Sequence, residues 1–507
     1  MTIAAILDLD TALATFRQTA QPLLQPTEMS QWDGSYLQAQ EQQIRQAALE
    51  LAGHCIAMLL QKLSQDLSAQ EQANQRTASS RGFGAQSQGK QQVSITTLGN
   101  VEVKLHSRYV LTRCPRSSCG QRRQRQAGQR GKSKGQGFYP LLRWLALEEK
   151  VTPLVWSTTA AAGMLSNSFA MARIQLQQWG INLSQQRIER LTYRFGQIGV
   201  ELTEQWLQQL EQGQLSIGES LRGQRVGLHV DGGRTRIRRA KRGRQPQQGR
   251  RGYYGDWCEP KLLTLYAIDE QGKRINTIAL PVTNDGTFGD VEQFMALLEV
   301  YLVKLGIVHA AQVLIVADGA LWIWQRLPSL LQRLGLPKER VIELIDFYHA
   351  TQHLLQFAEE AFANKSVQRQ WFKRARSQLK HKPFSLLLAK MYEQVEQQQS
   401  KSKQKKLKAH LAYFSAQPQR FAYAQVRAMK LPIGSGAIES LIRQVVNLRL
   451  KGTGKFWLAN HAEVVLHGRC QWAAGQWQQF SQSVLRAALD SKPLPILTPA
   501  SPQLVPA

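Results

Sequence analysis

The chain has 507 residues, of which 43% are hydrophobic, and its 64 Lys and Arg against 36 Asp and Glu give a formal net charge of +28. This apolar content excludes a wholly disordered basic protein and leaves room for roughly two to four packed domains. The sequence has no apolar run of transmembrane length, no basic flank typical of a signal peptide, and five scattered Cys that do not suggest a disulfide scaffold. We therefore predict a soluble, cytoplasmic protein without a membrane partner.

Positive charge is concentrated in three stretches that contain no acidic residue. Residues 113–143 and 234–251 each hold nine Lys or Arg, and residues 401–408 hold five Lys. Such stretches bind nucleic acid by releasing counterions, although each could also be a solvated surface segment. Because no aromatic-rich amphipathic helix accompanies them, nucleic acid is favoured over a membrane surface.

The N-terminal part begins with helical spacing of apolar residues over 35–70. Residues 71–92 are rich in Gln, Ser and Gly, which predicts a linker. Two alternating runs over 93–113 then predict a strand pair that turns at Gly99-Asn100.

Helical spacing returns over 141–212, with a turn at Gly180 and Ser184 as the expected cap of the next helix. Exposed Arg187 and Arg190 would follow that cap. This is a helix-turn-helix pattern typical of DNA binding, but an ordinary helical hairpin has the same signature.

From residue 225 the sequence changes to an α/β pattern. The predicted order of elements is β-β-β-α-β-α-β-α. The strands are predicted at residues 226–233, 260–269, 274–282, 312–320 and 341–349. This is the order of a ribonuclease-H-like domain, although several α/β folds share parts of it. Residues 365–430 are helical, and residues 431–450 predict a Gly turn followed by a helix.

These features predict an α/β protein with a ribonuclease-H-like catalytic domain, an all-α insertion and a mostly helical N-terminal DNA-binding region. The expected segments are 1–92 (helices and linker), 93–220 (hairpin, basic loop and helix-turn-helix-like region), 221–364 (first part of the catalytic core), 365–432 (helical insertion), 433–480 (catalytic helix and rest of the core) and 481–507 (Pro-rich, loose tail).

Two Asp residues stand at the predicted strand ends, each followed by Gly. Asp231 ends the first strand and Asp318 the fourth, while Glu439 begins the helix after the insertion. Neighbouring strand ends would bring the Asp carboxylates together, and hard ions such as Mg²⁺ (or Mn²⁺) bind carboxylate and phosphate oxygens. The alternatives are ordinary Asp-Gly turns and a Glu that suits a helix N-terminus.

Four other acids compete for a catalytic role. They are Asp269 and Asp285, which are predicted in loops, Asp290, and Asp346, which ends a buried strand and is the strongest competitor.

Basic residues flank the predicted acids and would hold phosphates. The candidates are Arg234, Arg236, Arg238, Arg239, Lys241 and Arg242 after Asp231; Arg443, Arg449, Lys451, Lys455 and Trp457 after Glu439; and Arg122, Arg123, Arg125, Arg187 and Arg190 in the N-terminal part. Trp457 would either stack on a base or anchor its loop by packing.

Several motifs together resemble one protein family. HVDGGRTRIRR, DWCEPKL, VADGA, IDFYHATQHL and IGSGAIES…RLKGTGKFW, in this order, are similar to ISKra-type bacterial insertion-sequence transposases, which are DDE transposases distantly related to the Mutator-like group. The resemblance covers residues 95–475 and is most specific over 225–460. It implies Asp231, Asp318 and Glu439 as the catalytic, metal-binding triad, and Asp346 and His349 as supporting residues.

The resemblance further implies metal-dependent cleavage and strand transfer at terminal inverted repeats. Two Mg²⁺ (or Mn²⁺) ions would be the cofactors, and double-stranded DNA at the transposon ends and target would be the partner. A homo-oligomer would join two ends at the bacterial nucleoid. Two other functions stay open: a different ribonuclease-H-like nuclease, and a catalytically inactive, transposase-derived nucleic-acid-binding protein.

A structural zinc site is not expected. Four residues separate Cys114 from Cys119, where relatives carry Cys-x-x-Cys, and His106 is the only further candidate nearby. These are at most three ligands, one fewer than structural zinc requires.

Overall fold

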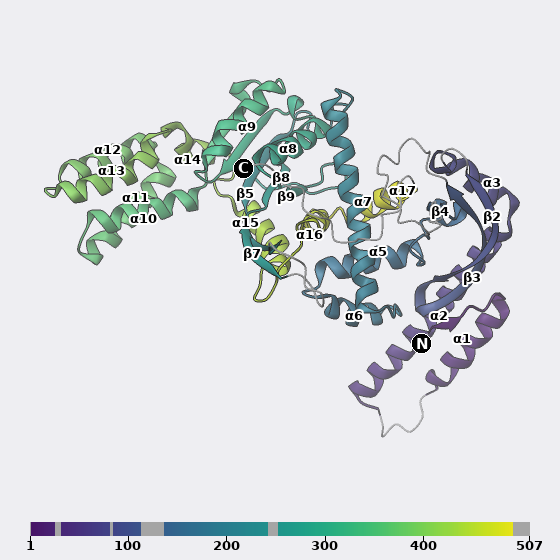
Figure 1. Cartoon of the computed structure of the whole chain (residues 1–507). Helices are drawn as coiled ribbons and strands as arrows, with labels where there is room; N and C mark the ends of the chain where they lie inside the picture. Colours follow the sequence, from purple (N-terminus) through teal and green to yellow (C-terminus); the bar gives the residue numbers. More distant parts are fainter. Residues whose placement is uncertain (1, 26–31, 82–84, 113–135, 242–251, 490–507) are drawn as a thin grey trace. The chain divides into compact units, whose positions relative to one another are not determined.

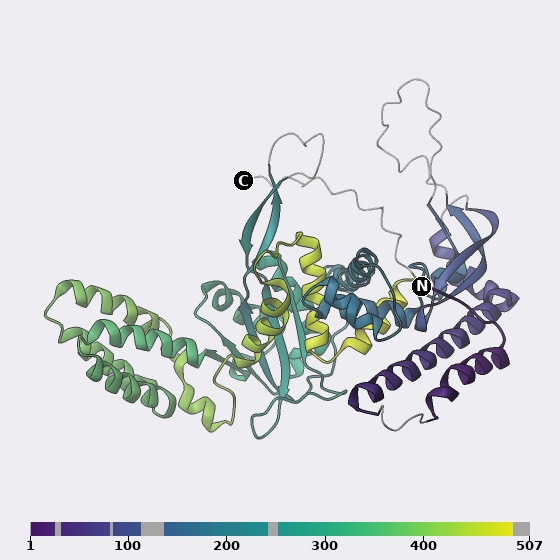
Figure 2. The same ribbon diagram turned by 90° about the horizontal axis from the view of Figure 1, so that it is seen from below.

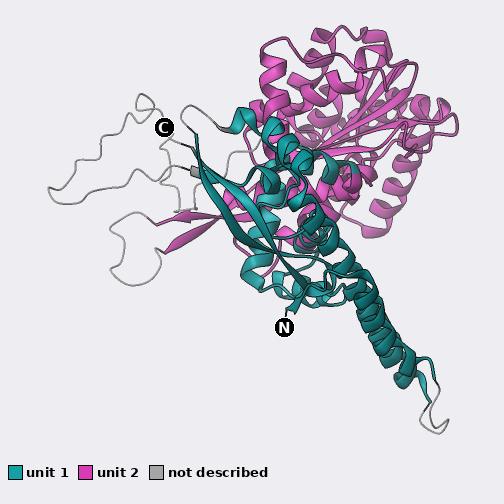
Figure 3. Ribbon diagram, turned by 90° about the vertical axis from the view of Figure 1, so that its right-hand side faces the viewer, with its two compact units in different colours: residues 1–199, 479–507 teal, residues 200–478 magenta. Residues whose placement is uncertain are grey.

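The computed structural model describes residues 2–25, 32–81, 85–112, 136–241 and 252–489 (Figure 1). The chain is a mixed α/β protein that divides into two compact units. The first unit comprises Met1–Gly199 and Gln479–Ala507, and the second comprises Val200–Gln478 (Figure 3). Among the described residues, none of the helices combines the length and apolar character needed to cross a membrane.

The first unit combines a small sheet with helices. The sheet has the order β1-β3-β2, with β4 also paired to β3. Its strands are β1 (Ile3–Ala4), β2 (Gln86–Thr96), β3 (Val101–Thr112) and β4 (Gln136–Phe138), and its helices are α1 (Leu9–Leu23), α2 (Gly34–Gln65), α3 (Leu67–Arg76), α4 (Pro140–Trp144), α5 (Pro153–Leu165) and α6 (Phe169–Gln177). Two helices include residues of both units: α7 (Gln185–Glu211) and α17 (Trp477–Ala487).

The predicted strand pair is confirmed. β2 and β3 pair antiparallel, and Gly99 and Asn100 turn the chain with φ of +62° and +60°. The predicted linker is wrong, because residues 71–76 belong to α3 and residues 86–92 belong to β2. The side chains of 86–92 are exposed, so their polar composition is compatible with a strand whose backbone is paired on one edge.

The helix–turn–helix order is also present. α6 ends before Gly180, whose φ is +64°, and Ser184 Oγ accepts the backbone N–H of Arg187 at 3.3 Å as the predicted cap. Arg187 is half-buried rather than exposed, because its Nη2 donates to the carbonyl of Glu149 at 3.0 Å. Arg190 is exposed and lies 3.7 Å from the Glu149 carboxylate.

The second unit is built on a five-stranded sheet with the order β11-β10-β5-β8-β9. β10 and β11 run parallel to β5, whereas β8 runs antiparallel to both β5 and β9. The strands are β5 (Arg225–Gly232), β8 (Lys261–Ile268), β9 (Thr283–Thr287), β10 (Gln312–Ala317) and β11 (Val341–Ile345). The accompanying helices are α8 (Val291–Leu305), α9 (Leu321–Arg333), α10 (Phe347–Ala361), α15 (Gly436–Ile442) and α16 (Ala459–Ala473).

The third predicted strand, residues 274–282, is wrong. That segment is irregular and leaves Ile278 94% exposed, and β9 follows it. β9 has the turn-like sequence Thr-Asn-Asp-Gly-Thr, so Asp285 lies on a strand and not in a loop. Its side chain is only 1% exposed because His467 and Tyr301 both bond to it.

A separate hairpin follows β5. β6 (Thr235–Ala240) pairs antiparallel with β7 (Tyr253–Cys258), and Figure 2 shows the two strands extending away from the five-stranded sheet. β6 agrees with the alternation in the basic run, but β7 was not predicted. A loop from the C-terminal part joins the hairpin, since Ile237 bridges Trp457 in parallel.

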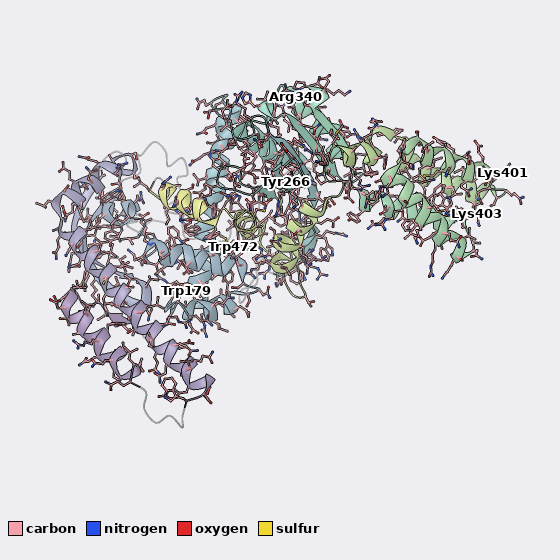
Figure 4. The ribbon with its side chains drawn as sticks, turned by 180° about the vertical axis from the view of Figure 1, so that it is seen from behind. Trp179, Tyr266, Arg340, Lys401, Lys403 and Trp472 are labelled. Carbon is pink, nitrogen blue, oxygen red and sulfur yellow. The ribbon has the colours of Figure 1, made fainter. Side chains whose placement is uncertain are left out.

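The segment between α10 and α15 is helical, as predicted. It contains α11 (Lys365–His381), α12 (Phe384–Glu396), α13 (Lys401–Ser415) and α14 (Tyr423–Ala428), and its buried side chains continue the core of the sheet. Lys401 and Lys403 lie exposed at the start of α13 (Figure 4). The predicted loose tail begins too early, because residues 481–487 form part of α17.

Candidate active site

Asp231 and Asp318 lie at the same edge of the sheet. In the parallel pairing of β5 with β10, Val230 is opposite Ala317, so the next residues of the two strands are neighbours. Gly232 N donates to Asp231 Oδ1 at 2.6 Å, and Ala320 N donates to Asp318 Oδ1 at 3.0 Å. The strand-end arrangement expected from the sequence is therefore present.

Glu439 lies in the first turn of α15, and Ser435 Oγ donates to its Oε1 at 3.0 Å. Its carboxylate is close enough to Asp231 to influence the titration of that residue. Asp318, at the end of a neighbouring strand, and Glu439, on a helix, therefore both lie near enough to Asp231 to raise its pKa. The helix enters the site after the long helical segment, which explains the large separation of Glu439 from the Asp residues in the sequence.

Burial raises the pKa of Asp231 from 3.8 to about 7. The carboxylates of Asp318, Glu439 and Glu259 raise it further, while the N–H of Gly232 has the opposite effect. Glu259 was not singled out from the sequence, although it belongs to the DWCEPKL motif. Carboxylates gathered in this way repel one another, and a bound cation would relieve that repulsion.

Asp346 connects the sheet to the loop before α15. Its side chain is 3% exposed and caps α10, with Oδ1 accepting the N–H of His349 at 2.6 Å. Its Oδ2 accepts the N–H of Ser435 at 2.5 Å. Asp346 is therefore fully engaged in holding two segments together, which suits a supporting role and not that of a metal ligand.

Tyr413 is a site residue that the sequence did not reveal. It projects from α13 and packs so closely on Gly319 that a Cβ there would lie 2.9 Å from its ring. Its hydroxyl is buried and has no hydrogen-bond partner among the described residues. Burial, together with the carboxylates of Asp318 and Asp346, raises its pKa. No local motif marks Tyr413, because only the folding of the helical segment brings α13 to the strand end.

The supporting histidine, His349, lies next to this tyrosine. Its ring centroid is 5.0 Å from that of His353, which in turn stacks on Tyr413 at 3.9 Å. Burial lowers the pKa of His353, and the nearby His349 and His410 act in the same direction.

The other competing acids have structural surroundings. Asp285 Oδ1 lies 2.9 Å from His467 Nδ1, and its Oδ2 accepts the Tyr301 hydroxyl at 2.6 Å. Asp290 caps α8 in a capping box, and Asp269 accepts backbone N–H groups within a turn. None of these three contributes to the pKa shift of Asp231.

The β6–β7 hairpin carries cations stacked on aromatic rings. Arg236 lies 4.7 Å from the ring centroid of Trp257, Arg238 lies 4.6 Å from that of Tyr253, and Lys241 lies 5.2 Å from that of Tyr254. Arg234 is exposed, and Arg239 pairs with Asp256 at 2.9 Å. Arg242 and the predicted Arg122, Arg123 and Arg125 lie outside the described residues, as do Cys114 and Cys119.

The basic residues after Glu439 differ in exposure. Arg443 and Lys451 are exposed, whereas Arg449 is 3% exposed and lies against the Trp457 ring. Trp457 is 8% exposed and its Nε1 donates to the carbonyl of Leu450 at 2.9 Å. These contacts favour the packing alternative for Trp457, and its stacking on a base stays a prediction.

The donor set around Asp231 consists of carboxylate oxygens, which suits a hard divalent ion. Within the described ranges, however, no three His, Cys, Asp or Glu side chains are arranged so that they could hold a metal ion. Any ion here would need further ligands, such as phosphate oxygens of a substrate.

Neither family models nor curated proteins show a match to this chain.

Proposed function

We propose that the chain is a DNA transposase of an insertion sequence, with Asp231, Asp318 and Glu439 as its catalytic carboxylates. The observation that carries the proposal is the raised pKa of Asp231, to about 7, in a site shared with the other two acids. Burial of the Asp231 carboxylate costs stability, and a carboxylate with so strongly raised a pKa is typical of an active site.

The fold of the second unit supports this proposal. In chain order its sheet has three antiparallel strands, β5, β8 and β9, followed by β10 and β11 parallel to β5. We assign this arrangement to the ribonuclease-H-like class, with α11 to α14 as an insertion between the second and third acids. In that class the carboxylates at adjacent strand ends serve phosphoryl transfer.

Asp231, Asp318 and Glu439 would hold Mg²⁺ together with phosphate oxygens of the DNA. When bound, the metal would polarise the phosphodiester and lower the pKa of the attacking water or 3′-hydroxyl. Ser435 orients Glu439 through the bond to Oε1, and Asp346 orients Ser435. The exposed cations Arg234, just before β6, and Arg238, on β6, would hold the DNA backbone next to Asp231.

The test begins with the DNA on both sides of the gene, where terminal inverted repeats would identify the substrate. Oligonucleotides of these ends, incubated with Mg²⁺, should be nicked by the wild-type protein and not by Asp231→Asn, which should still bind them. The matched control is Asp269→Asn, which changes a half-buried turn residue in the same unit.

Three results would contradict the proposal in different ways. Nicking by D231N would overturn the assignment of the catalytic acid. Binding without Mg²⁺- or Mn²⁺-dependent nicking by the wild-type protein would indicate an inactive DNA-binding protein. Cleavage confined to RNA–DNA hybrids or junctions would indicate another ribonuclease-H-like nuclease.

A further inference from the structure

A basic cavity lies between the β6–β7 hairpin and the loop after Glu439. Its volume is about 330 Å³, and its lining includes Thr235 and Arg236 from β6, Trp257 from β7, and Lys451, Thr453 and Lys455 from the loop. The described residues of this lining carry three cations and no acidic side chain. Thr235, the first residue of this lining in the sequence, follows Asp231 by only four positions.

The walls of the cavity are fixed by hydrogen bonds between the loop and β6. Arg238 N donates to the carbonyl of Trp457 at 2.7 Å, and Trp457 N donates to that of Arg236 at 3.1 Å. Thr235 Oγ1 donates to the carbonyl of Leu450 at 2.8 Å, which anchors the start of the loop. A site held in this way needs little rearrangement to bind a ligand.

The electrostatics of the cavity favour an anion. Burial and the nearby Arg449 and Arg469 lower the pKa of Lys455, so its ammonium group lies in positively charged surroundings. A phosphate placed among Arg236, Lys451 and Lys455 would offset this positive charge.

Trp257 gives the cavity an accessible aromatic surface. It is 48% exposed, although the guanidinium groups of Arg234 and Arg236 lie 5.4 and 4.7 Å from its ring centroid. Aromatic rings stack on nucleic-acid bases of any sequence. Within a duplex both faces of a base are covered by its neighbours, so only an unpaired or terminal nucleotide can stack on a protein side chain.

We propose that this cavity binds one unpaired nucleotide of the DNA, with its base on Trp257 and its phosphate among Arg236, Lys451 and Lys455. The volume lies at the lower end of the range for small-molecule sites and excludes a duplex. The inference rests on the proposed function, because it takes DNA as the substrate, and it adds a preference for a locally unpaired strand beside Asp231.

The experiment compares three labelled duplexes by fluorescence anisotropy, using the full chain in EDTA so that no cleavage occurs. One duplex is fully paired, one carries a single unpaired nucleotide, and one carries an abasic site in place of that nucleotide. The wild-type protein should bind the second duplex about 10-fold more tightly than the other two. Trp257→Ala should lose this preference, and Trp257→Phe should keep it.

Trp472 provides a matched control. It is also 48% exposed and lies on α16, outside the cavity (Figure 4), so Trp472→Ala should keep the preference. Equal binding of all three duplexes by the wild type, or a preference that survives W257A or is lost in W472A, would overturn the inference while leaving the transposase proposal intact. Failure of the wild type to bind any duplex would overturn both.

Discussion

Asp346 Oδ2 accepts the backbone N–H of Ser435 at 2.5 Å, a hydrogen bond between residues 89 positions apart in the chain. The same carboxylate caps α10, and Ser435 in turn donates its hydroxyl to Glu439. The position of Glu439 therefore depends on a buried acid at the end of β11. In this way a carboxylate that binds no substrate can control the geometry of the proposed active site.

Replacing Asp346 by Ala should impair both stability and catalysis. Two backbone N–H groups lose their acceptor, so we expect the free energy of unfolding to fall by about 1–3 kcal/mol. DNA nicking should slow while DNA affinity stays unchanged, because the basic hairpin is not altered. Asp346→Asn should be intermediate, since its amide offers one acceptor oxygen to two donors. Urea denaturation and nicking assays on the same variants measure these effects.

Asp290 is the control for helix capping alone. It caps α8 in the same unit, where it is exposed. Asp290→Ala should cost about 1 kcal/mol of stability and leave nicking at the wild-type rate. If D290A and D346A reduced nicking equally, loss of stability would explain both, and the positioning role of Asp346 would be wrong.

Tyr413→Phe removes one hydroxyl and keeps the ring. The hydroxyl is buried and has no partner among the described residues, so its loss should leave stability unchanged or raise it by about 1 kcal/mol. If the hydroxyl bonds to Asp318 or to a ligand in the loaded site, nicking should fall by about 10-fold. Thermal unfolding and the Mg²⁺ dependence of nicking separate the two effects.

Tyr392 is the control for Tyr413. It is 45% exposed on the neighbouring α12, and Tyr392→Phe should change neither quantity. A Y413F protein that nicks normally, with or without lower stability, would show that Tyr413 only packs against Gly319.

The sequence predicted the framework better than the details of the site. Asp231 and Asp318 were predictable because an apolar strand that ends in Asp-Gly is a local pattern. Tyr413 was not, since its proximity to Asp318 arises from the packing of α13, which no spacing encodes. β9 was missed because Asp285 resembles a turn residue until its long-range partner His467 is known.

Trp457 illustrates an ambiguity that a sequence cannot resolve. An aromatic residue after a basic Gly-containing loop suits either stacking on DNA or anchoring of the loop. The choice depends on whether Leu450 and β6 enclose the ring, and they do. The exposed ring instead belongs to Trp257, whose strand β7 lacked a clear alternating pattern.

Asp231 should make the stability of the protein depend on pH. Its pKa is raised to about 7 in the folded chain against 3.8 ordinarily, so the folded state holds more protons than the unfolded state between these values. The contribution of Asp231 to the free energy of unfolding therefore falls as pH rises from about 4 to 7. Asp231→Asn removes the cost of burying a charged carboxylate at this position. The variant should therefore be more stable than the wild-type protein at pH 8, by about 1–3 kcal/mol, but not at pH 4.

Mg²⁺ should reduce the loss of stability that the charged Asp231 carboxylate causes at high pH. At the proposed site the ion would bind the deprotonated carboxylate, so it should raise the unfolding temperature of the wild-type protein at pH 8 and have less effect at pH 5. D231N should respond weakly at either pH. Differential scanning fluorimetry with Mg²⁺ and with a matched concentration of NaCl checks this, and an equal response of both proteins would contradict it.

Salt dependence should distinguish the two described basic regions. If Arg234 before β6 and Arg238 on β6 contact phosphates, the Arg234→Ala/Arg238→Ala protein should show a slope of log affinity against log salt that is reduced by about 2. Lys401→Ala/Lys403→Ala removes the same charge from the exposed start of α13, where Lys406 already pairs with Glu360 at 3.3 Å. We expect this second variant to keep the wild-type slope, because lysines on a solvated helix face add little to DNA affinity through their charge alone. Equal slopes for the two variants would mean that DNA is attracted by net charge and not held at the hairpin next to Asp231.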